Sequence, residues 1–136
     1  MNISHWQGQD TLNLNEEEWL ALFQDKEIFK DIGLKMVAFV HGQPNFQSSA
    51  TEIGEALGGG SQQQVTAWNR AISKRIYKKL SKTPPFNYHG ERRYWNVLFD
   101  GDTEQEFDEL GRFIWQLRPP LIAAFEQLRA YKDITL

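Results

Sequence analysis

Cysteine is absent from the 136 residues of this chain. Its absence excludes a disulfide framework, zinc sites with thiolate ligands and catalysis by a thiol, and it is typical of proteins from a reducing compartment. Long apolar runs are also missing, and the N-terminus lacks the basic and then apolar pattern of a signal peptide. We therefore expect a soluble, cytoplasmic protein without a membrane segment. Its length is enough to form one core, so a single domain over 1–136 is expected.

Patterns that would indicate catalysis are equally scarce. The three histidines, His5, His41 and His89, lie in separate segments without the spacing of metal ligands. The acidic stretch 100–109 lacks the ordered oxygen ligands and central glycine of a calcium loop, and we interpret it as solvated. The glycines at 58–60 precede serine, whereas a nucleotide loop needs lysine followed by serine or threonine. We expect no enzyme, no metal site and no cofactor.

The strongest pattern in the chain is a pair of helix-start signals. Ser49 is followed by Glu52, and Ser61 by Gln64, at the spacing that lets side chains satisfy the free amides of a first helical turn. Three consecutive glycines lie between the two signals, and glycine adopts the left-handed backbone that helix ends favour. The pattern predicts two helices joined by a tight turn, at 50–57 and 62–80.

The second of these helices carries most of the clustered positive charge. Helical spacing predicts a buried stripe formed by Val65, Trp68, Ile72, Ile76 and Leu80. The opposite, polar face is predicted to hold Gln63, Ala67, Arg70, Lys74, Tyr77 and Lys78. Segment 70–93 contains eight basic residues and one acidic residue, a local charge of +7, which leaves −10 on the rest of a chain whose net charge is −3.

A basic second helix in a helix-turn-helix favours binding to double-stranded DNA, because that helix enters the major groove and positive patches attract polyanions. Gln63 and Arg70 are predicted to read base edges, since glutamine pairs with adenine and arginine with guanine. The predicted phosphate and backbone contacts are Lys74, Lys78, Lys82, Arg92 and Arg93. Tyr88 and His89 are candidates for stacking on an unpaired base.

The flanking segments supply further helices and two strands. Asn15 and Glu18 start a helical stretch that forms one helix or two helices broken near Asp25. Phe46 is expected to pack into the core ahead of the helix at 50–57. Strands are expected at 93–99 and 111–117, and a helix opens at Pro119 and Pro120.

These signals divide the single domain into five consecutive segments. They are an N-terminal arm at 1–14, a helical extension at 15–33, a helix-turn-helix core at 34–82, a β-wing at 83–118 and a C-terminal helix at 119–136. The predicted fold class is α+β and mostly helical, a winged helix-turn-helix with a three-helix core and a two-stranded wing.

Four motifs resemble a known module. They are Ala50-Thr51-Glu52-Ile53-Gly54-Glu55-Ala56-Leu57-Gly58, Lys74-Arg75-Ile76, Tyr94-Trp95-Asn96-Val97-Leu98-Phe99-Asp100-Gly101 and Phe113-Ile114-Trp115-Gln116-Leu117-Arg118-Pro119. Over about 34–128 the chain resembles the winged-helix-like module of modification-dependent restriction proteins, which accompanies a nuclease domain of the histidine–asparagine–histidine type. The resemblance implies DNA recognition, including recognition of a modified base, a nuclease domain or subunit as partner, and no catalysis in this segment.

A second reading of the same charge pattern stays open. The basic helix of a protein-interaction module, an adaptor or an inhibitor, would dock on an acidic partner, and the −10 outside the basic segment agrees with that. A solvated helix face that only keeps the domain soluble is the least specific interpretation. The sequence also leaves open whether the chain forms a homodimer.

Overall fold

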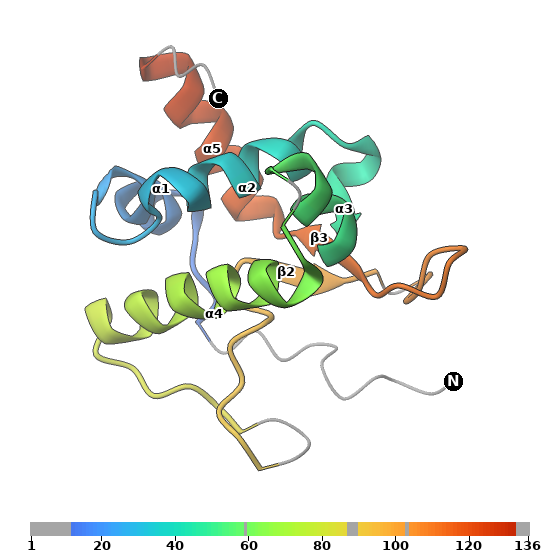
Figure 1. Cartoon of the computed structure of the whole chain (residues 1–136). Helices are drawn as coiled ribbons and strands as arrows, with labels where there is room; N and C mark the ends of the chain where they lie inside the picture. Colours follow the sequence, from blue (N-terminus) through green and yellow to red (C-terminus); the bar gives the residue numbers. More distant parts are fainter. Residues whose placement is uncertain (1–11, 59, 87–89, 103, 133–136) are drawn as a thin grey trace.

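The computed structural model describes residues 12–58, 60–86, 90–102 and 104–132 (Figure 1). These residues form five α-helices, a short 3₁₀ helix and one three-stranded antiparallel sheet, so the predicted α+β class is confirmed. Most of the predicted arm at 1–14, together with Gly59, Tyr88 and His89, lies outside the described residues. The elements are α1 (Glu16–Gln24), α2 (Lys30–His41), β1 (Gln47–Ser49), α3 (Ala50–Ala56), α4 (Gln62–Lys79), β2 (Phe99–Gly101), β3 (Ile114–Leu117) and α5 (Pro119–Lys132).

The N-terminal helices begin and end where local signals place them, with one exception. The Glu18 N–H donates to Asn15 Oδ1 at 2.8 Å, and Asn15 N–H donates back to the Glu18 carboxylate at 3.1 Å, which caps α1. The predicted break near Asp25 is confirmed, because α1 ends there. The predicted boundary at residues 33 and 34 is wrong, because α2 already begins at Lys30 and runs through it.

The two predicted central helices, α3 and α4, are confirmed with their start signals. Ser49 Oγ accepts from Glu52 N–H at 3.2 Å, and Ser61 Oγ accepts from Gln64 N–H at 3.1 Å. The turn between them needs one glycine within it and one in α3 beside it. Gly58 has a φ of 103°, which side chains disfavour, and a Cβ added to Gly54 would lie 2.3 Å from the Gly60 carbonyl oxygen. The backbone of the turn therefore lies directly against α3.

The sheet has the order β1-β3-β2, with β3 antiparallel to both neighbours. The strand expected at 111–117 is confirmed over Ile114–Leu117, whereas the strand expected at 93–99 is wrong except for Phe99, because 95–98 form turns. The pairing of β1 with β3 was not predicted, so the sheet has a third strand beyond the expected two.

Large apolar side chains fill the space between the helices and the sheet. Figure 1 places α4 along one side of the molecule and α1, α2 and α5 on the other. The final helix α5 docks as predicted, with Leu121, Phe125 and Leu128 buried. Phe46 is not the expected core residue, because it is 37% exposed with a φ of 56°. None of the helices in the described ranges has the length and apolar content needed to cross a bilayer.

Candidate nucleic-acid interface

The helix α4 has one buried side and one exposed side. Val65, Ile72 and Ile76 are at most 1% exposed, as the apolar stripe predicts, and Trp68 and Leu80 are half-buried at its edges. Three polar residues of α4 are also buried, namely Asn69, Ser73 and Tyr77.

Tyr77 was expected on the polar face, and its burial corrects that expectation. Its ring meets the ring of Tyr94 edge to face, with centroids 6.0 Å apart. The chain returns along α4 at 92–98 and covers this side of the helix, which periodicity within the helix does not predict.

The exposed side of α4 carries Arg70, Lys74 and Lys78, followed by exposed Lys82 beyond the helix end. Arg70 and Lys74 lie over the ring of Tyr94, with the guanidinium carbon and the amine nitrogen 5.1 and 5.6 Å from its centroid. Within the described part of the chain, none of these four cations forms an ion pair. We call Arg70, Lys74 and Lys78 the α4 cations.

Two other basic residues of α4 are engaged elsewhere. The Arg75 Nε–H donates to the backbone oxygen of Ile28 at 2.7 Å. Lys79 forms an ion pair with Asp25 in the connection between α1 and α2. The hydrogen bond from Lys79, followed by that from the Glu27 amide, holds the pKa of Asp25 below its usual value. A ligand on the exposed side of α4 therefore meets less positive charge than the +7 of segment 70–93.

Arg92 and Arg93 differ in accessibility although they are adjacent. Arg92 is exposed, donates to the Pro84 carbonyl at 2.9 Å and lies over the ring of Phe86, 4.1 Å from its centroid. Arg93 is 4% exposed, its Nε–H donates to Asn96 Oδ1 at 3.1 Å, and burial lowers its pKa. The expectation that Arg93 is accessible for a backbone contact is wrong, because its side chain is buried.

The N-terminal half of α4 presents uncharged polar groups. Gln63 is exposed in the first turn, as required of a residue that reads bases. Thr66, one turn further on, is exposed too, and its hydroxyl donates to the Gln62 carbonyl at 3.0 Å.

Two hollows flank this half of α4 and share Thr66 as a common wall. The smaller, of about 130 Å³, is lined by Thr66, Asn69, Arg70, Arg92, Arg93, Tyr94 and Trp95. The larger, of about 310 Å³, is lined by Ala50, Thr51, Gln62, Thr66, Phe107, Gly111, Arg112, Phe113 and Trp115. Trp95 and Phe113, one from each hollow, meet edge to face with ring centroids 5.1 Å apart. The predicted site residues did not include Asn69, Tyr94 or Trp95.

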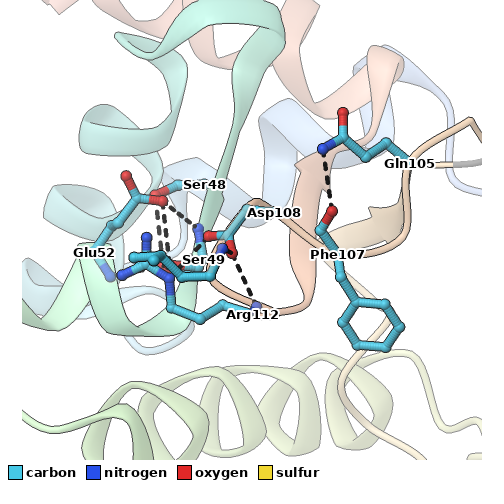
Figure 2. Close-up of polar contacts among 8 residues, drawn as sticks. Ser48, Ser49, Glu52, Gln105, Phe107, Asp108 and Arg112 are labelled. Atoms are coloured by element: carbon cyan, nitrogen blue, oxygen red, sulfur yellow. Dashed lines mark hydrogen bonds and ion pairs between the residues drawn. The ribbon is translucent and has the colours of Figure 1, made fainter.

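The connection between β2 and β3 has the opposite charge. Glu104, Glu106 and Glu109 are at least partly exposed, whereas Asp108 accepts from Arg112 Nε at 2.8 Å (Figure 2). Hydrogen bonding from the Arg112 amide, despite some desolvation, lowers the pKa of Asp108. In the part of the chain that the structure describes, no histidine, aspartate or glutamate cluster could hold a metal ion. We call residues 104–113 the acidic hairpin.

Comparisons with protein-family models, with curated proteins and with solved structures gave no match.

Proposed function

We propose that this chain is a winged helix-turn-helix domain that binds double-stranded DNA with α4 in the major groove. The observation that carries the proposal is the row of α4 cations, which are exposed on the second of two helices joined by a short turn and form no ion pair with any described residue. In this geometry the second helix presents its exposed side to base edges and phosphates.

The order of elements supports the winged form. The helices α2, α3 and α4 make a three-helix unit, and β2 and β3 follow as an antiparallel pair that β1 completes to a sheet. The acidic hairpin at the tip of this pair carries the same sign of charge as DNA, so the proposed contact runs through α4 and not through the hairpin.

The proposed contacts follow position along α4. Gln63 at the helix start and Arg70 in the middle of α4 read base edges, and Lys74, Lys78 and Lys82 bind phosphates. Arg92 lies at the edge of the smaller hollow and adds a backbone contact. The resemblance to modification-dependent restriction proteins extends the proposal to a modified base and to a nuclease subunit as partner.

Fluorescence anisotropy with plain and with cytosine- or adenine-modified duplexes over a salt series tests the proposal. We expect the Arg70→Ala, Lys74→Ala double variant to lose about tenfold or more in affinity, and the slope of log K against log salt to fall by about 0.9 for each phosphate contact removed. The matched control is the Lys26→Ala, Lys35→Ala double variant, which removes the same charge from exposed positions outside α4.

The outcome that would refute DNA binding is the absence of binding to any duplex at low salt by a folded protein. In that case the basic face would be assigned to an acidic protein partner, which the net charge of −3 and the acidic hairpin leave as the second candidate function. Loss of affinity in the control variant as large as in the test variant would show a general charge effect without a localised interface.

A further inference from the structure

The acidic hairpin holds two large apolar side chains in water. Leu110 is 74% exposed and Phe107 is 50% exposed, and the carboxylates of Glu104 and Glu109 on the same hairpin are exposed too. With four acidic residues and one arginine, the hairpin has a net charge of −3. Large apolar side chains exposed within a polar rim are typical of surfaces that contact another protein.

Internal hydrogen bonds fix the shape of this hairpin. The Asp108 N–H donates to the Arg112 carbonyl at 2.8 Å, and the Gly111 N–H donates to the Asp108 carbonyl at 3.0 Å. The Asp108 carboxylate also accepts from the Leu110 amide at 2.9 Å and from Arg112 Nε at 2.8 Å. A surface that is already ordered loses little conformational freedom when a partner docks on it.

The exposed side of α4 has the opposite charge. The α4 cations form no ion pair with any described residue. The segment that leaves the helix adds Phe86, which is 59% exposed, and Arg92 lies over its ring. Both surfaces therefore combine exposed charge with an exposed apolar ring, and their charges are of opposite sign.

The two surfaces lie apart on the same chain. The larger hollow places Phe107 and Gly111 of the hairpin beside Gln62 and Thr66 in the first turns of α4. Lys78 follows Gln62 by 16 residues, which is about 24 Å along a helix that rises 1.5 Å per residue. Figure 1 shows the hairpin projecting at the end of the molecule where α4 begins. A second copy can therefore meet both surfaces at once.

We infer that the acidic hairpin of one copy docks on the α4 cations of a second copy. A two-fold axis that makes the two α4 helices antiparallel lets each hairpin reach the cations of the other copy, so two equal contacts close the pair. Every copy brings both complementary surfaces, which is why a second copy is the occupant that the charges favour. The pairing does not depend on DNA binding, but its competition with DNA for the α4 cations rests on the proposed function.

Sedimentation velocity of wild type and of two charge-reversal variants tests the inference. Glu104→Lys with Glu109→Lys reverses the hairpin, and Lys74→Glu with Lys78→Glu reverses α4. We expect wild type to pair at low salt and to lose about tenfold or more in pairing affinity between about 0.05 and about 0.5 M salt. Each variant alone should be monomeric, and an equimolar mixture should restore the pair because each reversed surface then meets its complement.

Two further variants test the charge and apolar parts of the contact separately. The control Glu27→Lys, Glu55→Lys changes the net charge as the hairpin variant does, at exposed positions outside the hairpin, and should keep the pair. Leu110→Ser leaves every charge in place and should weaken the pair by about threefold to tenfold, because an apolar side chain no longer becomes buried. Circular dichroism checks that each variant is folded.

Three outcomes would overturn the inference. They are a wild type that stays monomeric at low salt, a pair that persists in either reversed variant, and a mixture of the two reversed variants that stays monomeric. Anisotropy with a duplex keeps the inference distinct from the proposed function, because the hairpin variant retains α4 and should bind DNA at least as tightly as wild type. Restored pairing in the mixture, without binding of any duplex by wild type or by the hairpin variant, would refute DNA binding and support the pairing.

Discussion

Arg70 and Arg118 carry the same guanidinium group in opposite surroundings. Arg70 is exposed on α4, lies over the ring of Tyr94 and forms no ion pair with a described residue. Arg118 is 7% exposed, and it donates to the carbonyls of Val97 and Asn96 and to the Asp100 carboxylate. The charge of Arg70 is available to a ligand, whereas the charge of Arg118 is buried and hydrogen-bonded within the fold.

The buried arginine explains how the segment before β2 keeps its shape without a strand ladder. Residues 95–98 form turns, so their carbonyls lack partners within the sheet, and Arg118 supplies donors to two of them. The same segment begins with Trp95 and so shapes the wall of the smaller hollow. The buried Arg118 thus holds the segment whose Trp95 lines the same hollow as the exposed Arg70.

The same substitution at the two arginines should give opposite results, and the larger effect is on stability. We expect Arg118→Met to lower the free energy of unfolding by about 3 kcal/mol, because two buried carbonyls and a carboxylate lose their donor. Arg70→Met should change the free energy of unfolding by less than about 0.5 kcal/mol while weakening DNA binding. Urea unfolding followed by tryptophan fluorescence measures the first, and anisotropy the second. Similar losses of stability in both variants would contradict the view that Arg118 stabilises the fold and that Arg70 does not.

A smaller loss of stability is expected for a substitution in α3 that presses on the turn between α3 and α4. This turn sets the direction of α4 and of its exposed cations. Gly54→Ala places a Cβ 2.3 Å from the Gly60 carbonyl oxygen, so the backbone must shift, and we expect a loss of about 2 kcal/mol by urea unfolding. The control is Gly42→Ala, whose added Cβ would lie 3.5 Å from the nearest atom, the Phe39 carbonyl oxygen, and whose effect should stay within about 0.5 kcal/mol. If both variants were equally stable, the turn would not fix the angle of α4.

The sequence predicted the elements whose signals are local. Ser49 with Glu52 and Ser61 with Gln64 start α3 and α4, since capping depends on residues within one turn. The strand expected at 93–99 failed before Phe99 because Val97 and Leu98 are buried without a strand partner, and the carbonyls of Asn96 and Val97 accept from the distant Arg118. Strand propensity measures suitability for a half-buried surface, and tertiary contacts decide whether a ladder forms.

The candidate site was also predictable only in part, because its exposed cations follow from local periodicity and its walls follow from distant packing. Helical periodicity places Arg70, Lys74 and Lys78 on the exposed side of α4, where the structure has them, while their DNA contacts stay a prediction. Periodicity did not indicate that a returning segment covers Tyr77 and buries Arg93, because that packing joins residues far apart in sequence. The hollow beside Asn69 depends on the same packing.

Lys79 is intermediate between the exposed Arg70 and the buried Arg118, and its ion pair gives the smallest expected effect on stability. It is exposed like Arg70, but its ion pair with Asp25 ties the end of α4 to the connection between α1 and α2. Because the folded-state pKa of Asp25 is lowered, its contribution to stability is fully present above the unfolded value of about 3.9 and is lost as pH falls through the folded pKa. We therefore expect wild type to be more stable than Asp25→Asn from neutral pH down to about pH 5, and the difference to shrink below about pH 4. Urea unfolding of both proteins across this range measures it, and a difference that stays constant down to about pH 3 would show that the carboxylate charge of Asp25 does not stabilise the end of α4.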